Sequence, residues 1–544
     1  MTDAGSAPGG GGIKIIVDDP LKMAFIDTSD LGNAKRLQII SRGRLLWIEE
    51  EKAWAYHDNQ RWSFKAGTRM AQNLAHDVVA HIDEEANAIG AIADDPIALK
   101  RLLGDWCSTE IAAKRAETLR GHAVRSGSAG MTTGMLKQAQ SFLPASIDDF
   151  DTDPLAYNVQ NGTLRFALAG GKPVLRFAPH DPVDMIMQLA DVEYHPDAEC
   201  PFWQSRLAML QPLGANRDAM QRLYGYTLTG LVSDQKFYVH QGRGGDGKSG
   251  THALLRSIHG DYYRHAAIET FLESRQRGGA EHRSDLVALK GDIRFICCDE
   301  PPGKSVFDGK TMKQITGSII TARAPNATKD TTFKPRGKVH IECNIIPRAP
   351  SDDKGFRRRF GLFRWKVSIA DTAEGELPED LIAARLNAEK PGVLNWLIEG
   401  ALAWLETRKI PVPEDSADLL AEYWADSSPL LEWMGEWCDT SDIEAKAPAK
   451  ELHAHFKAWC EERGIEKVMT PTAFGIALRD KQHGKWRHPK GGATWRCGIR
   501  LRTTGLFGDA PPVGGDGDAA GTNYERPGDY AGDSDLDGFL DGSQ

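Results

Sequence analysis

A glycine-rich segment with one lysine and one serine, GRGGDGKS, carries the clearest chemistry in this sequence. In the pattern G-x-x-x-x-G-K-S, glycines let the backbone turn so that successive N–H groups point at phosphates, and the lysine reaches the β and γ phosphates. The serine hydroxyl is then a ligand for Mg²⁺. The pattern predicts that ATP and Mg²⁺ are held by Gly242, Gly245, Gly247, Lys248, Ser249 and Gly250.

The simplest alternative to this phosphate loop is a glycine-rich turn followed by a serine that caps a helix. The context favours the loop, because a short apolar strand, Phe237 to His240, precedes the glycines and helical spacing follows them. Asp246 is unusual here, since a carboxylate beside bound phosphates repels them unless it faces outward. The prediction therefore expects an outward-facing Asp246.

A second apolar segment, Ile293 to Cys298, ends in two acidic residues fifty residues after Ser249. In phosphate-loop proteins an acidic residue at such a place holds the metal, and another residue orients the attacking water. We predict that Asp299 holds Mg²⁺ directly or through water, and that Glu300 orients and deprotonates the lytic water. An exposed acidic turn at the end of a strand is the alternative.

A third apolar strand, KVHIECNIIP, places Asn344 at its end, where an amide reaches both the γ-phosphate and the lytic water. A buried turn asparagine is the ordinary alternative. Arg357, Arg358 and Arg359 then precede another apolar strand. We predict that one of them is an arginine finger in a neighbouring subunit's site, which requires an oligomer. A solvated basic turn or plain DNA contact explains the same arginines.

The elements that position these residues predict an α/β phosphate-loop domain over residues 203–368. Helical spacing in WQSRLAMLQPL and DAMQRLYGYTLTGL precedes the first strand, and a helical lid or linker is expected over 369–428. Residues 429–502 predict three amphipathic helices, in LLEWMGEWC, KELHAHFKAWCEE and TAFGIALRDK, with a strand pair around Trp486 and Trp495. That order is typical of a small winged-helix domain.

Upstream, residues 13–202 predict an α+β region. RLLWIEEEKAWAYH has strand spacing and ALKRLLGDW has helical spacing, while RSGSAGMTTG indicates a break. In FDTDPLAYNVQNGTLRF, Asn161 and Gly162 predict a hairpin turn. Residues 1–12 and 503–544 are rich in Gly with few large apolar groups, so we expect a disordered lead and a disordered acidic tail.

Composition and charge exclude few functions. The net charge is −10, but nine acidic side chains against Arg526 lie in Gly505 to Gln544, so the rest of the chain is close to neutral and leaves room for basic surfaces. The eight cysteines are scattered, which favours reduced thiols and a cytoplasmic protein. The sequence has neither an apolar run of membrane-spanning length nor a secretory leader, so no membrane association is expected.

Together these segments resemble superfamily 3 helicases, in particular the phage and plasmid primase-helicases related to the poxvirus enzyme. FDTDPLAYNVQNGTLRF, VEYHPDAECPFW and LYGYTLTG are similar to the domain that precedes the motor in that family. CNIIPRAPSDDKGFRRRF is similar to its asparagine-containing third motif and arginine motif, and KAWCEERGI with WRCGIRL to its C-terminal winged-helix domain.

The resemblance implies an AAA+ type ATPase that forms a ring, expected to be a hexamer, and moves 3′ to 5′ on single-stranded and forked DNA in a bacterial host cell, encoded by a phage or prophage. Between the second and third motifs the family carries a DNA-gripping hairpin. The segment KQITGSIITARAPNATKDTTFKP fits that place, and its candidate DNA-binding residues are Lys313, Arg323, Lys329 and Lys334. An exposed basic loop is the alternative.

Many relatives also carry an N-terminal primase domain with a cluster of metal-binding acids, and the stretch up to about Phe150 shows no such cluster. We therefore predict that priming comes from a separate polypeptide or from the host. Two other functions fit the same phosphate loop: an ATP-switched origin-binding initiator or loader, and a small-molecule kinase. A kinase needs neither the arginine cluster nor the basic loop nor the winged-helix candidate.

Overall fold

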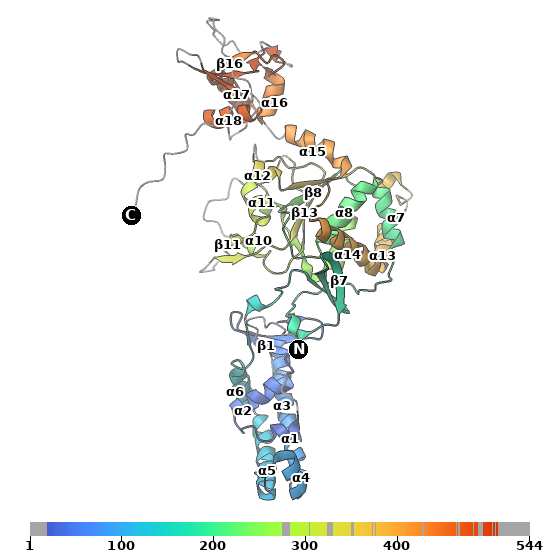
Figure 1. Cartoon of the computed structure of the whole chain (residues 1–544), viewed down its shortest axis with the longest axis vertical. Helices are drawn as coiled ribbons and strands as arrows, with labels where there is room; N and C mark the ends of the chain where they lie inside the picture. Colours follow the sequence, from blue (N-terminus) through green and yellow to red (C-terminus); the bar gives the residue numbers. More distant parts are fainter. Residues whose placement is uncertain are drawn as a thin grey trace, which may run out of the picture.

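Three parts of the molecule follow one another along its long axis in the computed structural model (Figure 1). The structure describes residues 19–274, 283–303, 305–323, 330–349, 353–372, 374–375, 377–426, 429–463, 465, 468–481, 483–487, 493–502, 504–505 and 508–509. The predicted lead at 1–12, the predicted start near Ile13 and most of the predicted acidic tail lie outside these ranges. Of the tail, β20 (Thr504–Gly505) and β21 (Gly508–Asp509) pair as a short antiparallel ladder.

The first part is a helical module with a small sheet at the end nearest the centre of the molecule (Figure 1). Its sheet has the order β3-β2-β1-β4, which confirms the strands predicted in RLLWIEEEKAWAYH. The elements are α1 (Pro20–Met23), α2 (Asp30–Ile40), β1 (Leu45–Ile48), β2 (Ala53–His57), β3 (Trp62–Ser63), α3 (Gly67–Gly90), α4 (Pro96–Leu103), α5 (Thr109–Ser126), α6 (Ala129–Ala139) and β4 (Pro144–Ala145).

Small residues at helical spacing explain how this module packs. On α3, Ala71, Ala75, Val78 and Ile82 are fully buried, and the alanines allow the partner helix α5 to approach closely. The module also buries the Arg36 guanidinium, which donates to both carboxylate oxygens of Glu85 at 2.8 and 2.7 Å. A buried charge is tolerated here because its hydrogen bonds are satisfied by the carboxylate and by backbone carbonyls.

Two local predictions in this region were wrong in detail. The segment RSGSAGMTTG does not break the chain over its whole length, because α6 begins at Ala129 and includes Gly134, where a β-carbon would meet Asp30 Oδ2 at 2.3 Å. Close packing of α6 on α2 thus explains a glycine that suggested a loop. The predicted hairpin is present, but Val159 pairs with Gly162, so its two turn residues are Gln160 and Asn161 rather than Asn161 and Gly162.

The second part is built on a five-stranded parallel sheet of order β14-β8-β13-β10-β9. The strands are β8 (Phe237–Gly242), β9 (Tyr263–Ala266), β10 (Phe295–Cys298), β13 (Lys338–Cys343) and β14 (Phe360–Trp365). The other elements are α7 (Pro201–Leu210), α8 (Gly214–Tyr226), α9 (Lys248–His259), α10 (Ser284–Val287), α11 (Gly309–Ile315), β11 (Ile320–Ala322), β12 (Thr331–Phe333), α12 (Lys354–Arg357), α13 (Glu379–Ala388), α14 (Lys390–Thr407) and α15 (Glu414–Asp426).

Helices cover both faces of this sheet, and its strands are therefore largely apolar on both sides. On β8, Phe237 and Val239 join one core with residues of α10, α11 and α12, while Tyr238 joins another with residues of α8, α9 and α14. Because all the strands are parallel, their carboxyl ends meet at one edge. The glycine-rich loop and the residues after β10 and β13 are therefore brought to the same edge.

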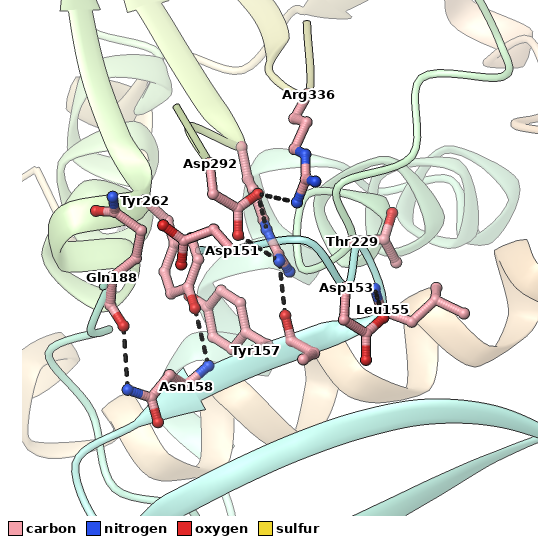
Figure 2. A network of polar contacts seen from close by, with 12 residues as sticks. Asp151, Asp153, Leu155, Tyr157, Asn158, Gln188, Thr229, Tyr262, Asp292 and Arg336 are labelled. Atoms are coloured by element: carbon pink, nitrogen blue, oxygen red, sulfur yellow. Dashed lines mark hydrogen bonds and ion pairs between the residues drawn. The ribbon is translucent and has the colours of Figure 1, made fainter. Parts of the chain in front are cut away.

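An antiparallel sheet, β5 (Ala156–Val159), β6 (Gly162–Ala169) and β7 (Lys172–Ala178), is joined to the central part by a buried polar network (Figure 2). The fully buried Arg294, just before β10, donates to Asp292 Oδ1 at 3.0 Å and Oδ2 at 2.6 Å and to the carbonyl oxygen of Ala156 at 2.6 Å. Its guanidinium also lies 4.7 Å from the ring centre of Tyr262. The segment before the parallel sheet thus shares its core.

The third part contains the three helices and the strand pair predicted for residues 429–502. They are α16 (Pro429–Trp437), α17 (Ala449–Glu462) and α18 (Pro471–Asp480), with β15 (Cys438–Asp439), β16 (Lys446–Pro448), β17 (Lys485–Arg487), β18 (Thr494–Cys497) and β19 (Arg500–Leu501). Trp486 pairs with Trp495 across β17 and β18. Among the described residues, no helix combines the length and the apolar character needed to cross a membrane.

Candidate functional site

The glycine-rich loop connects β8 to α9 at the carboxyl edge of the parallel sheet. Gly244, Gly245 and Gly247 have φ of +90°, +61° and +81°, a backbone region that other residues rarely adopt. The N–H of Ile369, which follows strand β14, donates to the carbonyl oxygen of Gly245 at 2.7 Å. The glycines are thus needed for the turn itself, as the pattern predicts.

The Asp246 side chain faces inward, which differs from the outward orientation that the sequence led us to expect. Its carboxylate accepts hydrogen bonds from the N–H groups of Gly244 and Lys248, both at 3.3 Å, and lies 2.5 Å from Lys248 Nζ. The cause is local, because these three donors point at one place and the carboxylate supplies negative charge there. The loop therefore has the donor arrangement of an anion site.

The Ser249 hydroxyl, at the exposed start of α9, donates to Glu342 Oε2 at 2.6 Å. The other oxygen of Glu342 accepts from His252 Nδ1 at 2.7 Å, and the remaining nitrogen of His252 accepts from the Tyr224 hydroxyl at 3.0 Å. Hydrogen bonds from His252 and Ser249 hold the pKa of Glu342 below its usual range although burial opposes this. A serine and a histidine of α9 thus meet a carboxylate of β13 under the loop.

Two further imidazoles lie beside His252 in the core. The rings of His240 and His340 are fully buried, and one nitrogen of each of the three histidines lies within 4.8 Å of the others. Trp365 Nε1 donates to His240 Nδ1 at 3.4 Å, and His240 Nε2 contacts His340 Nδ1 at 3.1 Å. Burial lowers the pKa of both His240 and His340, so both are neutral. Trp365, His240 and His340 thus form a chain of hydrogen-bonded uncharged rings in the core.

The acidic pair after β10 and the asparagine after β13 occupy the same edge. Glu300 Oε1 accepts from the backbone N–H of Asn344 at 2.8 Å, so these two predicted residues are neighbours. The Asn344 amide lies 4.0 Å from the place that a β-carbon on Gly244 would take. Asp299, by contrast, is 69% exposed and contacts His265 Nε2 at 3.1 Å.

The three predicted arginines have different surroundings. Arg357 lies over the ring of Trp424 at 4.7 Å, and Arg359 Nη1 donates to the carbonyl oxygen of Gly355 at 2.9 Å. Arg358 is exposed, and its Nη2 donates to the Gln235 side chain at 3.2 Å. Arg357 and Arg358 are thus both exposed, one over an aromatic ring and the other bonded to a neutral side chain, while Arg359 is partly buried.

The predicted basic hairpin is present as the antiparallel pair β11 and β12, with Ile320 opposite Phe333. Arg323 is half-exposed and pairs with Asp330 at 2.6 Å, and Lys334 is exposed. Lys313 lies on α11, where its ammonium contacts Asp353 at 2.7 Å. Lys329 lies outside the described residues.

Sequence reasoning missed Glu342, His252 and Tyr224. A signal was present in β13, where Lys338, His340 and Glu342 alternate with apolar residues in an otherwise buried strand. Polar residues on one face of a buried strand require partners. Both partners of Glu342 lie on α9, and Tyr224, the further partner of His252, lies on α8. No local pattern links those helices to β13.

The fold and this edge define a mixed α/β protein whose parallel sheet presents a glycine-rich loop, two carboxylates and an asparagine together. The family described as "D5 N terminal like" matches residues 34–212, and the family described as "Poxvirus D5 protein-like" matches residues 425–490. These matches confirm the resemblance found in the sequence: the chain is similar to the phage and viral primase-helicases related to the poxvirus protein.

Two viral relatives carry helicase names. The chain is 35% identical over 154 residues to "Putative helicase L207/L206" of Acanthamoeba polyphaga mimivirus, covering 28% of this chain and 16% of that protein. It is 27% identical over 284 residues to "Putative helicase 022R" of Frog virus 3 (isolate Goorha), covering 49% of this chain and 26% of that protein. The match thus spans at most about a quarter of either relative's length.

Among solved structures, the apo A form of the NrS-1 C-terminal region is similar with a TM-score of 0.45 and 10% identity. That similarity covers 87% of this chain and 99% of the other.

Proposed function

We propose that this protein is an ATPase that couples ATP hydrolysis to the unwinding of DNA during viral or phage replication. The observation that carries the proposal is the anion site of the loop, where Lys248 Nζ and the N–H groups of Gly244 and Lys248 converge on one carboxylate. A phosphate group presents the same charge and acceptor chemistry to these donors. Family membership and the helicase names of the viral relatives support the same function.

The residues around the loop fit ATP with Mg²⁺. Mg²⁺ prefers oxygen ligands, and the Ser249 hydroxyl and the nearby carboxylates supply them; when bound with ATP it neutralises charge that develops on the phosphates. Lys248 would bind the β and γ phosphates, Glu300 would accept the proton of the attacking water, and Asn344 would orient that water. In this structure Asp299 contacts His265. We propose that it turns to the metal when ATP and Mg²⁺ are bound.

For the assembly, we propose an AAA+ type ring of the superfamily 3 class, with six subunits and 3′-to-5′ movement. An exposed Arg358 suits a finger that reaches the next subunit, and the hairpin β11–β12 suits a loop that follows the phosphate backbone through Arg323, Lys329 and Lys334. The third part of the chain is proposed to be a winged-helix domain.

The test compares wild-type protein with Lys248→Ala and with the control Lys100→Ala, whose lysine is 71% exposed in the N-terminal module. ATP turnover is measured with and without single-stranded DNA, together with displacement of a labelled strand from forks that carry only a 3′ or only a 5′ loading tail. We expect turnover stimulated by DNA and displacement from the 3′-tailed fork, both lost in Lys248→Ala alone. Turnover without displacement would favour an initiator or loader, and no DNA response would overturn the proposal.

A second variant tests the proposed base. Glu300→Gln keeps the shape of the side chain and its contact with the Asn344 N–H, but it no longer accepts a proton. We expect ATP binding within about twofold of wild type and turnover at least roughly 100-fold lower. Normal turnover in Glu300→Gln would remove Glu300 from the site.

A further inference from the structure

Glu342 is a mostly buried carboxylate that contacts Ser249, the proposed metal ligand. Its side chain is 19% exposed, and its Oε2 accepts the Ser249 hydroxyl proton at 2.6 Å. A hydroxyl has one proton and two lone pairs. Because the proton of Ser249 is directed at Glu342, the lone pairs of Oγ are left to face the exposed side of the loop, where a cation can approach.

The position of Glu342 is set by groups that do not touch the loop. His252 Nδ1 donates to Oε1 at 2.7 Å, and Tyr224, fully buried on α8, donates to the other nitrogen of His252 at 3.0 Å. Because a carboxylate only accepts, Glu342 fixes the His252 proton on Nδ1, and Nε2 is left to accept from the Tyr224 hydroxyl. Metal sites commonly use this arrangement, in which outer partners orient the groups that hold the ion.

Glu342 and Asp299 also differ in their surroundings, although they are equivalent in register. Cys298 pairs with Ile341, so Asp299 and Glu342 come next on their neighbouring strands. The Asp299 side chain is 69% exposed and contacts His265, whereas Glu342 is mostly buried and contacts Ser249. A carboxylate held in a less polar place attracts a cation more strongly than an exposed one.

We propose that Glu342, held by His252 and Tyr224, is the carboxylate that orients Ser249 and holds the nucleotide's Mg²⁺ through the water molecules of the ion. The proposal rests on the proposed ATPase function and adds a residue to its metal site. Ser249 would hold the ion through its hydroxyl oxygen and Glu342 would hold it through a water, since Mg²⁺ usually keeps several waters. Glu342 and His252 act as positioning residues for the ion and for Ser249.

The test uses Mn²⁺ as a paramagnetic substitute for Mg²⁺ and measures its binding to the full chain with ADP by electron paramagnetic resonance. In Glu342→Gln we expect Mn²⁺ affinity to fall roughly 10- to 100-fold, the usual cost of losing an outer partner of a metal site. ADP binding in EDTA should stay within about twofold of wild type, because Lys248 and the loop are unchanged. Glu51→Gln, exposed in the N-terminal module, is the matched control.

Two further variants distinguish the loss of the Glu342 charge from the loss of its position. Glu342→Asp retains the charge but is too short to contact Ser249 and His252 together, so its Mn²⁺ affinity should also fall, and His252→Asn should give a smaller loss. Wild-type Mn²⁺ affinity in both Glu342 variants, with a loss in Asp299→Asn, would overturn the proposal and leave Asp299 as the metal carboxylate. If wild-type protein binds no ADP at all, the proposed function fails instead.

Discussion

The Asp246 carboxylate lies 2.5 Å from the Lys248 ammonium, and both side chains are 5% exposed. The lysine expected to bind phosphate is thus engaged by a carboxylate within the same loop. ATP must displace this carboxylate, because the Gly244 and Lys248 N–H groups that the phosphates need also bind it.

From this relationship we predict that Asp246→Asn binds ATP more tightly than wild type. The asparagine keeps the size of the side chain but removes a negative charge within a few ångströms of the phosphates, which is worth about 1 kcal/mol or more. The KM for ATP should therefore fall roughly fivefold or more, measured together with nucleotide affinity by fluorescence titration. An unchanged or weaker affinity would show that the carboxylate swings away without cost.

Arg294 gives a prediction about stability. Its guanidinium is fully buried and joins Asp292 to the Ala156 and Leu228 carbonyls. Arg294→Met keeps the volume but leaves Asp292 buried with one partner fewer, so we expect the free energy of unfolding to fall by about 3–5 kcal/mol. Urea unfolding followed by tryptophan fluorescence measures the change.

Arg336→Met is the control for this experiment. Arg336 also contacts Asp292, at 3.1 Å, but its side chain is 20% exposed, so its loss should cost less than the loss of Arg294. An equal cost for the two variants would mean that burial of the guanidinium is not what matters.

Asp151 gives a prediction about pH. Burial, together with the nearby Asp292 carboxylate, raises the pKa of this carboxyl to about 6. The folded state therefore binds this proton more tightly than the unfolded state, whose carboxyl has its ordinary pKa near 3.9. Protonated Asp151 therefore stabilises the folded state. This contribution to the free energy of unfolding is complete below about pH 4 and is lost as the pH rises through about 6.

Asp151→Asn replaces the titrating carboxyl with an amide, so the variant does not lose this stability as the pH rises. We expect the variant to gain stability relative to wild type as the pH rises from 4 to 7.5, by at most about 3 kcal/mol. The backbone at Asp151 has φ of +51°, which asparagine also tolerates, and any benefit there is independent of pH. The measurement is the difference in unfolding free energy between the two proteins at several pH values, and a difference that does not change with pH would contradict the prediction.

Local pattern was enough to predict most of the elements of this fold. The strand before the glycine-rich loop, the helix after it and the strands that end near Glu300 and Asn344 all lie where the spacing of apolar residues indicates them. These features depend on neighbours in the sequence, since apolar periodicity reports on burial of each segment by itself. The short distance from the Asn344 N–H to Glu300 then follows from the parallel strands.

The contacts that the sequence did not reveal join segments far apart in the chain. Glu342 lies 93 residues from Ser249, and their contact depends on β13 lying beside β8, with α9 packed on the face that Glu342 occupies. The inward Asp246 was missed for another reason, because the side-chain direction depends on where the loop N–H groups point. Pattern predicts elements, whereas pairings across the sheet and side-chain rotamers require the assembled fold.

The surroundings of the three arginines predict which one acts on a neighbouring subunit. Arg357 is exposed but lies over the Trp424 ring, and Arg359 donates to the Gly355 carbonyl, while the exposed Arg358 contacts the neutral Gln235 side chain. We expect Arg358→Ala to bind ATP normally and to turn it over roughly 1,000-fold more slowly, since a finger is worth about that much or more. Arg357→Ala should instead lower stability with a smaller effect on turnover.

Mixing two inactive variants distinguishes a finger from a local role. Lys248→Ala subunits have an intact Arg358 and no working loop, and Arg358→Ala subunits have the reverse. If Arg358 reaches the next subunit's site, some interfaces in a mixed ring combine an intact loop with an intact arginine, and turnover should return in proportion to those interfaces. Turnover that stays at the level of the separate variants, although mixed rings form on a sizing column, would place Arg358 in its own subunit's chemistry or outside it.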